Sequence, residues 1–97
     1  MTQSVQDIEG EPALRLDRLL VYLRFARTRS AAHAMIEKGA LRHNRHHVRR
    51  ASEAVKVGDV LTLAQGEDIR IVEILSLPNR RASPAAAKAH YREHSRA

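Results

Sequence analysis

Arginine is the residue type that gives this sequence its chemical character. It occurs fourteen times, against three lysines, in 97 residues. Residues 15–50 hold ten basic and two acidic side chains, a net charge of +8, although the whole chain carries only +6. The guanidinium group binds phosphate through paired hydrogen bonds and stacks on bases. Because charge of one sign in one segment attracts polyanions, the pattern indicates a nucleic-acid ligand rather than a surface that is basic only for solubility.

Asp17 lies within this basic segment and is the residue that a general-base mechanism would use. No serine, cysteine or second carboxylate stands near it in the sequence to complete a catalytic site. A carboxylate in the first turn of a helix meets the positive end of the helix dipole, and it can also pair with arginine. We therefore interpret Asp17 as structural and expect no enzymatic activity.

Three histidines, at positions 43, 46 and 47, could in principle bind a metal ion, since imidazole is a ligand for zinc and copper. The surrounding arginines make this a poor place for a cation, so we expect no metal and no other cofactor. We expect these histidines to be exposed or to face the nucleic acid. In the second case, protonation near their ordinary pKa of about 6.5 would strengthen binding.

Missing residue types exclude several classes of function. The chain has no cysteine, which excludes disulfides, thiolate metal ligands and a cysteine nucleophile. No apolar run approaches the roughly 20 residues that a membrane span requires. The polar and acidic start of the chain does not have the form of a secretory signal. We expect a cytoplasmic protein without a membrane partner.

Two helices are predicted to carry the basic segment. Leucines at 16, 19, 20 and 23 form one apolar stripe, which predicts a helix that begins at Leu14 and continues to about Arg27. Thr28 or Ser30 is the expected N-cap of a second helix, and Gly39 is the expected stop. The arginines concentrate at and around the turn between the two helices.

The second half of the chain is predicted to be rich in strands. Residues 40–43 and 46–49 form a hairpin around Asn44-Arg45, and residues 60–63 and 69–77 form two further strands. Pro84 favours a last helix from residue 85 to about 93. The order α-α-β-β-β-β-α predicts an α+β fold in which a two-helix hairpin packs on a small, mostly antiparallel sheet. We expect a disordered lead-in over residues 1–13, one domain over 14–94, and a tail over 95–97.

A series of short motifs follows in order along the chain: Arg15-Leu16-Asp17, Thr28-Arg29, Ala32, Ile36, Gly39, Asn44 and Val57-Gly58-Asp59. In this order and spacing the chain resembles the ribosomal protein S4-like RNA-binding domain. Within that superfamily it is most similar to the heat shock protein 15 family of small ribosome-associated bacterial proteins. The narrower resemblance is carried by Arg24-Phe25, Lys38-Gly39, and residues 61–66 and 80–86. The chain departs from the family pattern at Arg45, where the hairpin glycine is usual. The sequence also stops before the basic C-terminal extension of the family, so we do not expect binding through that extension.

The resemblance implies that the helix pair and the first β-hairpin form an RNA-binding surface. The residues that it implies face RNA are Arg15, Arg24, Thr28, Arg29, Lys38 and Asn44. Charge alone adds Arg27, Arg42, Arg45, Arg49 and Arg50. We expect phosphates to bind to arginine side chains and to the N–H groups at the start of the second helix. Because aromatic residues are few and none falls in a predicted strand, we expect recognition of folded or duplex RNA rather than base stacking.

The resemblance also implies a non-enzymatic protein that binds ribosomal RNA of the large (50S) subunit. Its role would be in recycling or quality control of stalled subunits that carry peptidyl-tRNA, with tRNA as a further partner, and we expect a monomer. One alternative is an RNA-targeting module for a separate enzyme such as a pseudouridine synthase. Another is a DNA-binding helix–turn–helix protein, which is disfavoured because the alanines at 31, 32 and 34 are too short to read bases.

Overall fold

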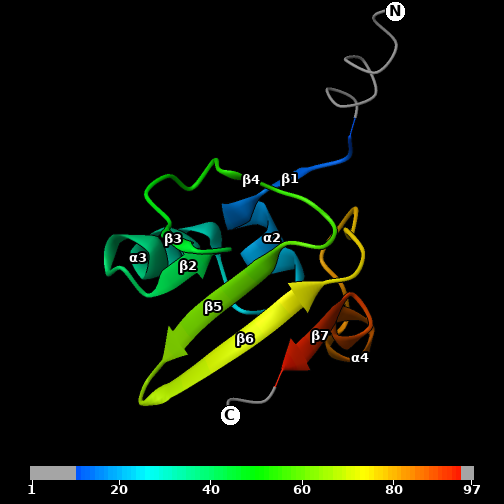
Figure 1. The fold of residues 1–97 in the computed structure, drawn as a ribbon. Coiled ribbons are helices and arrows are strands. Elements are labelled where there is room, and N and C mark those ends of the chain that lie inside the picture. Colours follow the sequence, from blue (N-terminus) through cyan, green and yellow to red (C-terminus); the bar gives the residue numbers. More distant parts are fainter. Residues whose placement is uncertain (1–10, 95–97) are drawn as a thin grey trace, which may run out of the picture.

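Two helices lie against one face of a twisted antiparallel sheet (Figure 1). The computed structural model describes residues 11–94. In chain order its elements are β1 (Leu14–Arg15), α2 (Leu16–Tyr22), α3 (Arg29–Glu37), β2 (Leu41–His43), β3 (His46–His47), β4 (Ala54–Val55), β5 (Val60–Gln65), β6 (Asp68–Ile74), α4 (Pro84–Lys88) and β7 (Tyr91–His94). The predicted α+β class and the antiparallel sheet are confirmed.

Helix α2 forms where the leucine stripe was found, and all four leucines of the stripe are buried. No side chain caps its start. Instead, the N–H groups of Leu16 and Asp17 donate to the carbonyl oxygens of Glu53 (2.8 Å) and Ala51 (3.0 Å). These bonds satisfy donors that a helix cannot satisfy internally, and they hold the segment before β4 beside the start of α2.

The predicted bounds of the first helix were wrong at both ends. Leu14 and Arg15 form β1, which pairs with β4 in a separate two-stranded sheet. The helix ends at Tyr22 because Arg24 adopts the left-handed conformation, with φ of +67°, which ends the helical hydrogen-bond pattern. The Arg24 Nε donates a hydrogen bond to the carbonyl oxygen of Ala82 at 2.6 Å. No glycine marks this position, so the residue types alone did not indicate the stop.

Helix α3 begins and ends as its residues predict. The Thr28 hydroxyl oxygen accepts a hydrogen bond from Ala31 N–H at 3.1 Å, so Thr28 and not Ser30 is the N-cap. Gly39, with φ of +74°, follows the last turn. Ala32 and Ile36 are buried, and α3 packs against α2.

The five-stranded sheet has the order β3-β2-β5-β6-β7, and every neighbouring pair is antiparallel. Strand alternation places one set of side chains toward the helices. Leu41 pairs with Leu63, and Leu61 pairs with Val72, all of them buried. Together with the leucines of α2 they form an aliphatic core, as expected for a chain with so few aromatics.

The predicted last helix is much shorter than expected. Helix α4 ends at Lys88, and Tyr91–His94 form β7, which pairs with β6. Tertiary contacts favour the strand. The Tyr91 ring packs on Phe25, between α2 and α3, with ring centroids 5.0 Å apart, and Arg70 of β6 lies over the Phe25 ring and pairs with Glu93 at 2.8 Å. Tyr91 therefore corrects the expectation that no aromatic lies in a strand.

The predicted lead-in over residues 1–13 lies outside the described residues except for 11–13, which are exposed and belong to no helix or strand, and the predicted tail over 95–97 lies outside them entirely. Among residues 11–94, no helix has the length and apolar character needed to cross a membrane.

Candidate nucleic-acid interface

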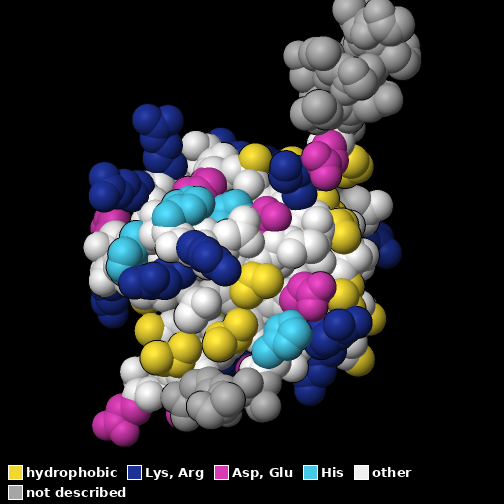
Figure 2. Space-filling view, viewed as in Figure 1, with side chains coloured by type: hydrophobic (Ala, Val, Ile, Leu, Met, Phe, Trp, Pro, Cys, Tyr) yellow, Lys and Arg dark blue, Asp and Glu magenta, His cyan; other side chains and the backbone are white. Residues whose placement is uncertain are grey.

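Four of the predicted arginines surround one open hollow on the surface. The hollow has a volume of about 560 Å³ and is lined by Arg42, Arg45, Arg49 and Arg50, together with His46, His47 and Glu53. All four arginines are exposed. Figure 2 shows basic and histidine side chains gathered on the side of the molecule that α3, β2 and β3 form. These arginines form one surface that can bind several phosphates at the same time.

The β2–β3 hairpin positions this hollow. Asn44 has φ of +58°, and its Oδ1 accepts a hydrogen bond from Val60 N–H at 2.9 Å. Asparagine tolerates the left-handed region better than most residues. Arg45 does not have a positive φ, so the hairpin needs no glycine there. Asn44, predicted to face RNA, is exposed but has this turn as its visible role.

A second group of predicted residues meets at Asp17. The Asp17 side chain is fully buried and accepts hydrogen bonds from Arg15 (Nε and Nη2, both 3.1 Å), Arg29 Nη2 (3.0 Å) and His33 Nε2 (2.9 Å). Burial opposes ionisation, but these bonds and the Arg18 N–H hold the pKa of Asp17 well below its usual range. The interpretation of Asp17 as an arginine partner is confirmed.

The Asp17 partners keep part of their surface free. Side chains of Arg15 and Arg29 remain 44% and 57% exposed. Each guanidinium has five N–H donors, and Arg15 uses two of them and Arg29 one of them on Asp17. Asp17 therefore fixes the direction of both arginines and leaves donors that can bind phosphate.

The two groups are joined by a smaller hollow of about 210 Å³ between α3 and the segment before β4. It is lined by His33, Ile36, Glu37, Arg49 and Ala51. His33 belongs to the Asp17 group and Arg49 to the larger hollow. We call the resulting continuous surface the arginine face: it consists of Arg15, Arg29, His33, Arg42, Arg45, Arg49 and Arg50.

The structure does not place the remaining predicted residues on the arginine face. Arg24 lies with α4 and β7, where it lines a different hollow with Phe25, Arg70 and Tyr91. Arg27 and Lys38 are exposed; Arg27 lies just before α3, and Lys38 is its C-cap. Thr28 uses its hydroxyl oxygen on Ala31 N–H, so that N–H is not open to a phosphate.

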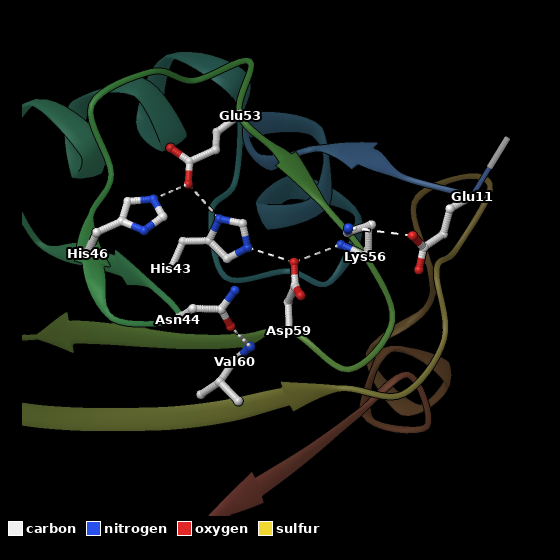
Figure 3. Close-up of polar contacts among 8 residues, drawn as sticks. All are labelled: Glu11, His43, Asn44, His46, Glu53, Lys56, Asp59 and Val60. Atoms are coloured by element: carbon white, nitrogen blue, oxygen red, sulfur yellow. Dashed lines mark hydrogen bonds and ion pairs between the residues drawn. The ribbon is translucent and has the colours of Figure 1, made fainter. Parts of the chain in front are cut away.

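The expectation that the three histidines are exposed was wrong for His43. Its side chain is only 7% exposed, with Nδ1 2.5 Å from Glu53 Oε2 and Nε2 2.7 Å from Asp59 Oδ2 (Figure 3). Burial lowers its affinity for a proton, but the two carboxylates outweigh this and raise the pKa of His43. Glu53 also accepts from His46 Nε2 at 2.8 Å. Within residues 11–94, His43, His46 and Glu53 form a group with the spacing of metal ligands.

Sequence reasoning missed His33 as a partner of Asp17 and the burial of His43. The burial of His43 could have been predicted from the sequence. In a strand, alternate residues share a face, so His43 lies on the same face as the buried Leu41, while Arg42 points outward. No sequence signal pairs His33 with Asp17, because this contact depends on how α2 and α3 cross.

Comparison with known proteins identifies the family. Residues 14–61, which hold α2, α3 and the β2–β3 hairpin, match the S4 domain. The trimeric structure of Vibrio cholerae heat shock protein 15 superposes with a TM-score of 0.79 and 33% identity, over 87% of this chain and 84% of that one. This chain belongs to the heat shock protein 15 family. The membership confirms the family resemblance seen in the sequence motifs.

Two curated members of the heat shock protein 15 family show the same relation. The heat shock protein 15 homolog of Haemophilus influenzae is 37% identical over 84 residues, which are 87% of this chain and 63% of that protein. Heat shock protein 15 of Escherichia coli K12 is 35% identical over 88 residues, which are 89% of this chain and 65% of that protein. The chain thus spans just under two thirds of these relatives' length.

Proposed function

We propose that this chain is a non-enzymatic RNA-binding protein whose arginine face binds phosphates of ribosomal RNA. The observation that carries this proposal is the placement of Arg42, Arg45, Arg49 and Arg50 around a single open hollow, continuous through His33 with Arg15 and Arg29. A surface that kept the protein soluble would not need these cations on one side. Membership of an S4-domain family supports the same ligand class.

The mode of binding follows from the side chains available. Arginines supply paired donors for phosphate oxygens, and these contacts fix position without reading base sequence. Tyr91, the one aromatic found in a strand of the described residues, is half-buried and packs on Phe25. It does not form the exposed stacking platform of sheet-type RNA binders. We infer that the shape of folded or duplex RNA, and not unpaired bases, is recognised.

Within this class, we propose the large ribosomal subunit as the target, in the cytoplasm, with the protein acting as a monomer. The role we propose is the recycling or quality control of stalled subunits that carry peptidyl-tRNA. The similarity to the heat shock protein 15 family supports the target and the role. The monomer is an expectation from the sequence alone, and the similar Vibrio cholerae heat shock protein 15 was solved as a trimer.

Two measurements test the proposal at its two levels. A labelled duplex segment of ribosomal RNA, bound by the protein, is challenged with unlabelled RNA duplex or unlabelled DNA duplex; we expect RNA to compete at least about tenfold better. Equal competition would point to a general polyanion binder or a DNA-binding protein. In a sucrose gradient of cell extract, we expect the protein in large-subunit fractions, and its absence there would reject the ribosomal target.

A further inference from the structure

We propose that His43, His46 and Glu53 form a binding site for a divalent transition-metal ion of the zinc class, at the edge of the arginine face. The metal proposal does not depend on the proposed RNA binding, because the three protein ligands all come from this chain. Each of the three residues offers one ligand atom, and the three atoms lie within 4.8 Å of one another. Two imidazole nitrogens and a carboxylate oxygen are a donor set that zinc accepts.

The distances are close to those of a bound ion. Glu53 Oε2 lies 2.5 Å from His43 Nδ1 and 2.8 Å from His46 Nε2. Zinc bonds of about 2.0–2.1 Å in a tetrahedron separate neighbouring ligand atoms by about 3.3 Å. Glu53 Oε2 therefore needs to move away from each nitrogen by less than about 1 Å. The two nitrogens lie within 4.8 Å of each other and would have to settle at about 3.3 Å. His46 can make this movement because its side chain is 61% exposed and lies in a two-residue hairpin strand.

The buried ligand is already oriented as in metalloproteins. His43 directs Nδ1 toward Glu53, and its other nitrogen lies 2.7 Å from Asp59 Oδ2 (Figure 3). Asp59 Oδ2 is in turn fixed by the Lys56 N–H at 3.0 Å. A metal-bound histidine commonly donates its second N–H to a carboxylate, which sets the tautomer and makes the metal-facing nitrogen a better ligand.

The charges near the site differ from those expected from the sequence. The expectation of no metal rested on the absence of cysteine and on the arginines of this segment. The fold adds two carboxylates, Glu53 and Asp59, whose side chains are 21% and 15% exposed. The four arginines around the hollow are exposed, so solvent screens their charge. The Arg42 side chain contacts His47, with Nη2 3.3 Å from Nε2, and His47 is not one of the three proposed ligands. Carboxylate oxygens of Glu53 and Asp59 lie 2.5 and 2.7 Å from the two ring nitrogens of His43, so this ligand has a negative charge on either side.

One coordination position would stay open. His46 and Glu53 line the arginine hollow, so an ion held by three protein ligands would face it. Zinc sites with three protein ligands hold water or a substrate group in the fourth position. Here a phosphate oxygen is a chemically suitable fourth ligand, and the ion would release the protons that the imidazoles direct at Glu53.

The test is a zinc titration of the full chain, free of any histidine tag and without RNA, by calorimetry at pH 7.5. We expect one Zn²⁺ per chain with a micromolar or lower Kd. His46→Ala removes an exposed ligand and is expected to weaken binding at least about tenfold. His47→Ala is the matched control, because His47 lines the same hollow but lies outside the cluster; it should change Kd less than about twofold. Circular dichroism checks that both variants are folded.

Cobalt provides a second readout that does not depend on affinity alone. Co²⁺ bound to the wild type should give the intense visible absorption of tetrahedral coordination, and His46→Ala should lose it while His47→Ala keeps it. The proposal is overturned if the wild type binds no Zn²⁺. It is also overturned if the two variants weaken binding equally, which would indicate adventitious capture by surface histidines.

Discussion

Arg29 Nη2 lies 3.0 Å from the buried Oδ2 of Asp17, although twelve residues separate the two in sequence. The bond joins the start of α3 to the start of α2. It also directs a guanidinium that is more than half exposed toward the arginine face. Asp17 is thus a positioning residue for the proposed RNA-binding surface as well as part of the core.

Replacing Asp17 by asparagine should destabilise the fold. The variant keeps the side-chain shape but loses the charge that accepts bonds from Arg15, Arg29 and His33. Hydrogen bonds to charged groups contribute about 1.5–3 kcal/mol each, less where the donor is exposed. We expect a loss of about 2 kcal/mol in the free energy of unfolding, measured in urea. Asp68→Asn, at the exposed first residue of β6, is the control and should stay within about 0.5 kcal/mol of the wild type.

Acid should remove the contribution of Asp17. Its pKa in the folded state lies below the value of about 3.9 for an unfolded aspartate. The unfolded chain therefore binds the proton first as the pH falls, and the stabilisation, complete at neutral pH, declines below about pH 5. The stability difference between wild type and Asp17→Asn should shrink from pH 7 to pH 3. A constant difference over that range would show that the carboxylate charge is not its source.

Arg24 offers a test of backbone strain. At φ of +67° a side chain is disfavoured, whereas glycine is not. Arg24→Gly and Arg24→Ala both lose the bond to the Ala82 carbonyl, so comparison of the two isolates the backbone term. We expect the glycine variant to be more stable by about 1 kcal/mol. At Arg27, which does not have a positive φ, the same pair of substitutions should show no advantage for glycine.

Salt should weaken RNA binding steeply. If about five phosphates are neutralised, a plot of log K against log salt concentration should have a slope of about −3.5 to −4.5. Filter binding between low and moderate salt measures it. A slope near zero would mean that the arginines do not contact phosphate.

The parts of the fold that local signals encode were predicted from the sequence. The leucine stripe of α2, the Thr28 cap, the Gly39 stop and the Asn44 hairpin each depend on neighbouring residues, and the structure contains all four. β7 was missed, because an alanine-rich segment after a proline favours a helix. The strand depends on tertiary contacts: Tyr91 packs on Phe25, and Glu93 pairs with Arg70 of the neighbouring strand β6.

The residues of the site were also predicted only in part, because charge density is visible in the sequence and tertiary packing is not. Charge density identified the arginines at 42, 45, 49 and 50, since they crowd one hairpin and the segment after it, and the structure places them around one hollow. Charge density could not separate Arg24, which the left-handed turn directs toward α4. It also could not reveal that Glu53 and Asp59 lie on either side of His43, because those contacts depend on tertiary packing.

The central claim is that RNA binds at the arginine face and not to basic charge in general. The most direct test compares two double variants that each remove two positive charges. Arg45→Ala with Arg49→Ala alters the face, and Arg80→Ala with Arg81→Ala alters a separate hollow near α4. We predict that the first pair weakens binding to a ribosomal RNA duplex at least about tenfold and lowers the salt slope by about 1.5, while the second changes affinity less than about threefold. Equal losses in both pairs would contradict a localised RNA-binding surface.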